Sequence, residues 1–179
     1  MLQRHGGRIR GRARVGERGA AAVEFALILP VLIMLLLGVT TAGLTYSDHL
    51  AITNSVREAG RLGASTTFDP LAPSGWANAV QERVQQVYFN GGSTVATSQI
   101  CVQLVNSAGG VVATPTSQGT TCGPAPTSPT MTAGSCVVKV WLRKQGKIVL
   151  AVAPNLTPTL GARSVSYYGR TVGTTCVAS

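Results

Sequence analysis

The chain has 179 residues, of which 45% are hydrophobic and only 12% are charged, and its formal net charge is +9. Six arginines and one glutamate give residues 1–18 a charge of +5, which leaves +4 for the rest. The high isoelectric point is therefore not a nucleic-acid signature of the C-terminal part. Residues 44–179 are enough for one domain with a modest core but not for two.

The most apolar stretch, residues 19–43, contains a single acid, Glu24. Twelve Val, Ile, Leu and Phe residues within 23–39 favour insertion by about −4 to −7 kcal/mol. A mid-bilayer carboxylate costs about +2.5 to +3.5 kcal/mol, and less near the cytoplasmic edge. The arginine-rich flank is of the kind retained in the cytoplasm. The sequence therefore predicts a transmembrane helix over residues 20–43, with its N-terminus inside and the C-terminal domain outside the cell membrane.

A removable signal peptide is the alternative reading of this stretch. Its apolar region is typically about 7–15 residues long and is followed by small residues. Thr40, Thr41 and Ala42 form a weak site of that kind. The stretch is longer than such a region, and no helix breaker or polar gap precedes these residues, so a retained helix is favoured.

The residues around Glu24 carry a resemblance to a known family. The string RGAAAVEF at residues 18–25 resembles the class III signal of type IV pilins and pseudopilins, in which a prepilin peptidase cuts after Gly and Glu is the fifth mature residue. Over residues 17–63 the chain most resembles the TadE-like minor pseudopilins of Tad (tight adherence) pilus systems. The resemblance implies processing residues Gly19, Ala20, Glu24 and Phe25, and assembly residues Glu24 and Pro30, the latter as a helix kink.

This motif would pair the carboxylate of Glu24 with the positive charge of a new N-terminus. A cut after Gly19 would remove the basic leader, residues 1–19, and create a free amine on Ala20, one helical turn from Glu24, where opposite charges attract. In an assembled fibre, the resemblance implies, Glu24 would neutralise the amine of a neighbouring subunit. The alternatives are that Glu24 only snorkels to the headgroups, and that Pro30 is a packing feature of one helix.

The resemblance also implies a function and partners. We expect a non-enzymatic, single-pass minor pseudopilin that assists biogenesis or assembly of a Tad-type adhesive pilus. Its partners would be a prepilin peptidase, Tad platform membrane proteins, and other pilins or pseudopilins. We expect no cofactor and no small-molecule substrate. One alternative is an unprocessed signal-anchored envelope protein whose head binds a ligand or surface polymer. A less favoured one is a DNA-uptake pilus subunit.

Beyond the span, the helical period continues through residues 44–65 and predicts a stalk extension of the same helix. A separate short helix after a break at residues 40–43 is the alternative, and residues 66–73 end the helix in either case. A second helix is predicted from an N-cap at Ser74 to a stop at residues 90–92. Its Trp76 is expected in the core rather than at the membrane interface.

The remainder alternates with period two and predicts a small α+β head, residues 66–179, with an antiparallel sheet. Strands are expected at residues 98–105 and 111–113, in a hairpin of 136–142 with 148–152 joined by 143–147, and at 163–168. The Thr/Ser/Pro-rich segment 114–135 reads as an exposed loop and a poor candidate for core. It is either a recognition surface or a tolerated insertion, and the second is favoured.

Four cysteines, Cys101, Cys122, Cys136 and Cys176, lie in the part predicted to be outside, which favours two disulfides. Three pairings are possible, and the sequence does not choose among them.

No Cys-x-x-Cys spacing occurs and the only histidines are His5 and His49, so no metal site is expected. Past the stalk the only acids are Asp69 and Glu82, which gives catalysis little support. The remaining cations form either a patch that attracts anions or, as favoured here, a solvated face. Among them are Arg143, Lys144, Lys147, Arg163 and Arg170.

Overall fold

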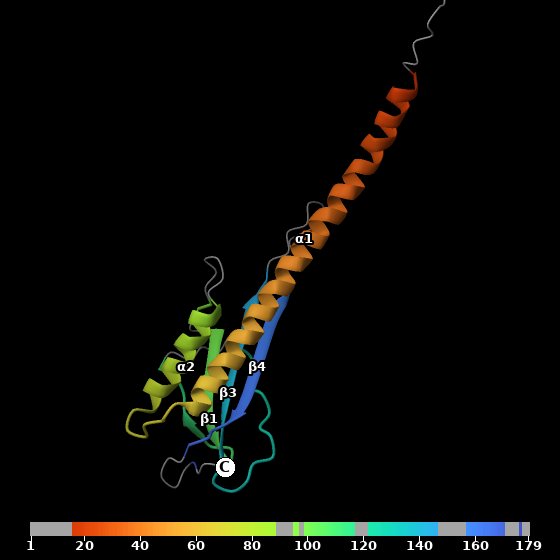
Figure 1. The fold of residues 1–179 in the computed structure, drawn as a ribbon. Coiled ribbons are helices and arrows are strands. Elements are labelled where there is room, and N and C mark those ends of the chain that lie inside the picture. Colours follow the sequence, from red (N-terminus) through yellow and green to blue (C-terminus); the bar gives the residue numbers. More distant parts are fainter. Residues whose placement is uncertain are drawn as a thin grey trace, which may run out of the picture.

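The computed structural model describes residues 16–88, 95–96, 99–116, 122–146, 157–170 and 176. Figure 1 shows one long helix whose C-terminal half lies on a sheet beside a second helix, while its N-terminal half extends away from them. The expected α+β class is confirmed. The elements in chain order are α1 (Gly16–Ser65), α2 (Pro73–Tyr88), β1 (Ile100–Asn106), β2 (Val111–Ala113), β3 (Cys136–Gln145) and β4 (Thr159–Tyr167).

Helix α1 runs unbroken through residues 40–43, so the expected single helix is confirmed and the alternative of a separate short helix is wrong. The hydroxyls of Thr40 and Thr41 donate to the carbonyl oxygens of Leu36 and Leu37, each at 2.7 Å. These bonds to the preceding turn satisfy the two hydroxyl groups, and the helix continues past them.

The four strands form one antiparallel sheet in the order β2-β1-β3-β4. Val140 of β3 lies opposite Val102 of β1 and Ser164 of β4. Because successive side chains of a strand point to opposite faces, Val140 faces the core that α1 and α2 cover, while Trp141 faces the other side. The side of the sheet that carries Trp141 is its outer face.

Helix α2 begins at Pro73, one residue before the expected cap at Ser74. Proline suits the first helical turn because its fixed φ is already helical and its missing N–H has no intrahelical partner there. Trp76 is 5% exposed and donates its indole N–H to the carbonyl oxygen of Gly63 at 3.1 Å. Its expected place in the core is confirmed. The predicted stop at residues 90–92 lies outside the described residues.

The predicted hairpin after residue 136 is wrong. Strand β3 continues through residues 143–145, the expected turn, and it is flanked by β1 on one side and β4 on the other. Both hydrogen-bonding edges of β3 are thus occupied. The second strand of that hairpin, expected at 148–152, lies outside the described residues. The polar run stays in the strand because Arg143 points to the solvent-facing side, whereas Lys144 finds polar partners on the helix side. Strand β4 also begins at Thr159, earlier than expected.

The described part of the Thr/Ser/Pro-rich loop, residues 114–116 and 122–135, was expected to be exposed and a poor candidate for core. Most of it is exposed, but it also covers the outer face. Trp141 donates its indole N–H to the carbonyl oxygen of Gly123 at 3.0 Å, and the Tyr167 hydroxyl donates to that of Thr130 at 3.0 Å. Cys122 packs with Cys101 and Trp141 in a small second core. The segment therefore forms a cover for the sheet rather than an outlying insertion.

Candidate functional site

The N-terminal half of α1 is bare and apolar. Residues 19–37 are all exposed, and Leu27 and Val39 show 72% and 73% of their surface. The helix is long and apolar enough to cross a membrane, and none of its most apolar stretch is buried by the rest of the described chain. Exposing this much apolar surface to water would cost about 25 cal/mol per Å². The surface therefore suggests a membrane anchor.

The predicted processing residues share one exposed stretch of this helix. Gly19, Ala20, Glu24 and Phe25 all lie within α1. Ala20 and Glu24 are four residues apart in the helix and so lie on the same face. Glu24 makes no hydrogen bond or ion pair with any described residue, and the space around the α-carbon of Gly19 is open. The carboxylate is thus placed to take a partner, and both residues at the expected cut are accessible.

Pro30 lies inside α1, six residues after Glu24, and the helix continues past it. Its missing N–H leaves the carbonyl oxygen of Ala26 without the usual intrahelical bond. Inside a membrane span such a position is tolerated. The kink itself stays a prediction.

A cluster that the sequence analysis did not single out lies where α1 leaves the head. The hydroxyl of Tyr88 donates to a carboxylate oxygen of Asp48, and the ammonium of Lys144 donates to the Tyr88 hydroxyl. The Lys144 ammonium also lies 3.5 Å from the other Asp48 oxygen and 4.8 Å from the centre of the Tyr88 ring. The three residues come from α1, α2 and β3. No local pattern could have joined them, because the shortest separation in sequence is 40 residues.

The surroundings raise the pKa values of both Tyr88 and Lys144 in this cluster. Burial, together with the hydrogen bond to Asp48, raises the pKa of Tyr88. Burial by itself lowers the pKa of Lys144, but the hydrogen bond to Tyr88 and the nearby negative charge of Asp48 outweigh it, so the pKa is raised. Both groups therefore hold their protons more tightly in the folded chain than in an unfolded one.

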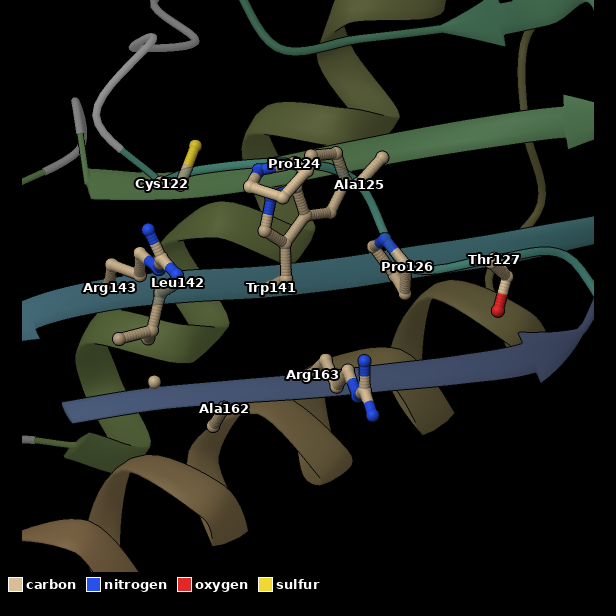
Figure 2. Close-up of a pocket in the computed structure, with 11 residues that line it drawn as sticks. Cys122, Pro124, Ala125, Pro126, Thr127, Trp141, Leu142, Arg143, Ala162 and Arg163 are labelled. Carbon is tan, nitrogen blue, oxygen red and sulfur yellow. The ribbon is translucent and has the colours of Figure 1, made fainter. Parts of the chain in front are cut away.

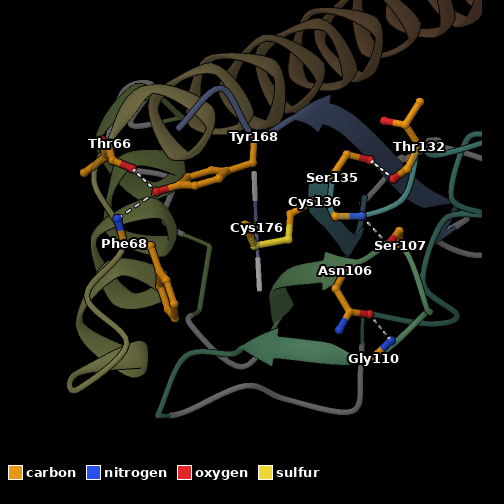
Figure 3. The surroundings of a disulfide bond; sticks show 11 residues. Thr66, Phe68, Asn106, Ser107, Gly110, Thr132, Ser135, Cys136, Tyr168 and Cys176 are labelled. Carbon is orange, nitrogen blue, oxygen red and sulfur yellow. Dashed lines mark hydrogen bonds between the residues drawn. A yellow bond between two sulfur atoms is a disulfide. The ribbon is translucent and has the colours of Figure 1, made fainter. Parts of the chain in front are cut away.

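The structure selects one of the three disulfide pairings. Cys101 bonds to Cys122, and Cys136 bonds to Cys176, with Cα–Cα distances of 6.1 and 5.3 Å. Figure 3 shows the second bond beside Tyr168. Disulfides persist in oxidising compartments, so the two bonds suggest an extracytoplasmic domain.

Tyr168 connects this region to the end of α1. Its hydroxyl accepts a hydrogen bond from the Phe68 N–H at 2.8 Å and donates to the Thr66 carbonyl oxygen at 3.1 Å (Figure 3). The end of β4 is therefore tied to the connection between α1 and α2.

The candidate cations do not share one surface in the described chain. Arg143 and Arg163 face outward from the sheet, whereas Lys144 is on the helix side with Asp48. Arg170 lies at the other end of β4 and donates to the carbonyl oxygen of Ser65. Lys147 lies outside the described residues. Among the residues that the structure describes, no group of His, Cys, Asp and Glu side chains could hold a metal ion.

Comparison with protein families identifies the helix. Residues 19–61 match the family model described as TadE-like protein. Over that segment the chain is similar to TadE-like proteins. No curated protein and no solved structure matches the chain. The TadE-like segment includes both the bare half of α1 and most of the half that packs on the sheet, and it ends before α2.

Proposed function

We propose that this protein is a TadE-like minor pseudopilin that assists biogenesis or assembly of a Tad-type adhesive pilus, without enzymatic activity. The observation that carries the proposal is the family match over residues 19–61, on a helix whose apolar half is bare. A prepilin peptidase cuts after Gly19, the span keeps its inner end at the cytoplasmic face, and the head lies outside. Tad platform proteins and other pilins or pseudopilins contact the bare half of α1.

The charge of Glu24 supports the cut. An unpaired carboxylate is costly in a membrane span, and Glu24 has no partner among the described residues. Removing residues 1–19 places a free amine on Ala20, on the same face of α1 one turn away. In the fibre the partner is the amine of a neighbouring subunit, so that the pair fixes the register between subunits.

Mass spectrometry of the membrane-bound form tests the processing step. We expect a mature N-terminus at Ala20. An intact arginine arm would contradict the proposal and would favour a signal-anchored envelope protein, whereas a chain secreted free of lipid would contradict both readings.

Substitution of Glu24→Val tests the assembly step. We expect cleavage after Gly19 to continue and incorporation into the pilus fraction to be lost, because the amine of the neighbouring subunit has no carboxylate to neutralise it. The measurement is immunoblotting of sheared pili and of membranes. Glu58→Gln is the matched control, since Glu58 lies on α1 within the head and pairs with Arg83. Normal incorporation of the Glu24→Val chain would show that Glu24 only snorkels.

A further inference from the structure

A pocket of about 280 Å³ lies on the outer face of the sheet. Figure 2 shows the loop around Pro124 and Pro126 passing over the strands, with Arg143 on β3 and Arg163 on β4. The indole of Trp141 stands beneath this loop. The pocket lies on the side of the sheet away from α1, so neither the membrane span nor its expected cut contributes to it.

The hollow exists because Gly161 of β4, which has no side chain, lies opposite Arg143 on the adjacent strand β3. Gly161 pairs with Arg143, and Arg163 pairs with Trp141. A Cβ added at Gly161 would approach nothing closer than 3.7 Å, so the space above its backbone is open. Arg143 and Arg163 are therefore diagonal neighbours on one face, about 7–8 Å apart at their backbones. Figure 2 shows the Arg143 guanidinium on the Cys122 side and the Arg163 guanidinium on the Thr127 side, so the two charges flank the pocket.

Neither arginine has its charge compensated. Arg143 and Arg163 make no hydrogen bond or ion pair with any described residue. No Asp or Glu follows Glu82 in the sequence, so none of the four strands and no part of the covering loop carries a carboxylate. Two exposed guanidinium groups without a nearby acid create a local positive potential that attracts anions.

The covering loop fixes one of the two arginines in place. A Cβ added at Gly123 would lie 3.1 Å from Cδ, Nε and Cζ of Arg143, so the guanidinium packs directly against the Gly123 backbone. Gly123 has φ +74° and follows Cys122, which is bonded to Cys101 of β1. The carbonyl oxygen of Gly123 also accepts the indole N–H of Trp141. A disulfide and a hydrogen bond therefore hold this part of the pocket in its shape before any ligand arrives.

We propose that this pocket binds an acidic saccharide unit, a pyranose ring that carries a carboxylate. The planar forks of Arg143 and Arg163 match a carboxylate with paired N–H···O bonds. Beside them the ring of Pro124 is exposed, while Trp141 and Pro126 are buried and form an apolar floor. An exposed proline ring suits the flat C–H face of a sugar and would contribute nothing to the binding of a free inorganic ion. The pocket is close in size to the smallest ligand sites, about 300 Å³, and holds one sugar ring.

The test uses the full-length chain in a neutral detergent micelle and isothermal titration calorimetry. The probes are an oligosaccharide of glucuronic acid, the matched oligosaccharide of glucose, an acidic tripeptide and inorganic phosphate. We expect the glucuronic acid oligosaccharide to bind, and the other three to bind at least about tenfold more weakly. Arg143→Gln and Arg163→Gln should each weaken binding about tenfold or more, as the loss of a charge-assisted hydrogen bond implies.

Arg57→Gln is the matched control because Arg57 is an exposed arginine of α1, the helix on the opposite side of the sheet. It removes the same charge and should leave the affinity unchanged. Equal binding of the glucose oligosaccharide, phosphate or tripeptide would overturn the proposal, as would wild-type affinity in both arginine variants. Intact disulfides and an unchanged melting temperature in each variant establish that the fold is preserved. The pocket does not involve residues 1–43. A failure to bind the saccharide would therefore not contradict the proposed pseudopilin role, and an uncleaved N-terminus would not contradict the proposed binding.

Discussion

Two glycines allow α1 to lie directly on the sheet and on α2. A Cβ added at Gly60 would come within 2.7 Å of the Ser164 hydroxyl, whose side chain can rotate away. At Gly63 the neighbouring atoms cannot easily move away, because they are methyl and ring carbons of the packed core at 3.0 to 3.2 Å from an added Cβ. Gly63 also supplies the carbonyl oxygen that accepts the Trp76 indole N–H. A glycine in a helix interior is intrinsically unfavourable, so its use at Gly63 is explained by close packing.

Substitution of Gly63→Val should destabilise the head by about 1–3 kcal/mol, as overpacking of a dense core does. The measurement is denaturant unfolding of the full-length chain in neutral detergent, followed by tryptophan fluorescence. Gly75→Val is the control, since Gly75 has nothing within 4 Å of an added Cβ. A loss no larger for Gly63→Val than for the control would show that the packing is looser than the contacts indicate.

At the scale of elements, the point where α1 leaves the head is fixed by residues from three of them. Asp48 lies on α1, Tyr88 at the end of α2, and Lys144 near the end of β3. The Lys144 and Asp48 side chains retain 20% and 26% of their exposure, so water weakens but does not abolish their attraction. The cluster keeps the bare half of α1 in a defined direction relative to the sheet.

The raised pKa values of Tyr88 and Lys144 predict a loss of stability in alkali. Groups that hold protons more tightly when folded contribute fully below their ordinary pKa values of 10.0 and 10.5, and lose that contribution as pH rises through the folded values. The free energy of unfolding should therefore fall above about pH 10. In Tyr88→Phe the fall should be smaller, because the substitution removes the ionising phenol and also the hydrogen bond that raises the pKa of Lys144. Stability at neutral pH should be lower by about 1 kcal/mol.

The pH profile is measured by denaturant unfolding at a series of pH values. Arg57→Gln, an exposed substitution on α1 away from the cluster, should keep the wild-type profile. Identical profiles for wild type and Tyr88→Phe would exclude a contribution of the cluster.

At the scale of the whole molecule, α1 serves two different surroundings. From Ile52 onward it is part of the head, where Ile52, Val56 and Ala59 are fully buried beneath the helices and sheet. Before that point its large apolar side chains are exposed, from Val23 to Leu50. One continuous helix therefore has a half that is buried in the head and a half that is bare.

A chain that begins at Thr45 should fold in water without detergent, because it retains every part of α1 that the core contains. We expect it to be monomeric by light scattering, with both disulfides formed. A chain that begins at Gly60 is the matched comparison. It lacks Ile52, Val56 and Ala59 and should aggregate or remain unfolded, since each lost large apolar side chain leaves a cavity worth about 2–5 kcal/mol. Aggregation of the longer chain would show that the head depends on the bare half of α1.

Much of this architecture was readable from local patterns. The apolar run, the continued helical period, the core position of Trp76 and the strands before residue 113 all follow from periodicities that each segment carries by itself. The TadE-like resemblance was readable for the same reason, since its residues are contiguous. The hairpin at 136–152 failed because the turn-like polar run 143–147 has the composition of a loop. Only the presence of β4 and of Asp48 and Tyr88 shows why residues 143–145 remain in a strand.

The sequence by itself determined the long apolar helix, the fold class and the presence of paired cysteines, because hydrophobic period and composition act over a few helical turns or strand residues. The tertiary structure alone decided which cysteines pair, how the Thr/Ser/Pro-rich segment covers the sheet, and how Gly161 leaves a hollow between Arg143 and Arg163. These features depend on strand register and on contacts between residues tens of positions apart. The physical reason is that a strand's pattern indicates which side chains share a face, but not which neighbour lies beside it.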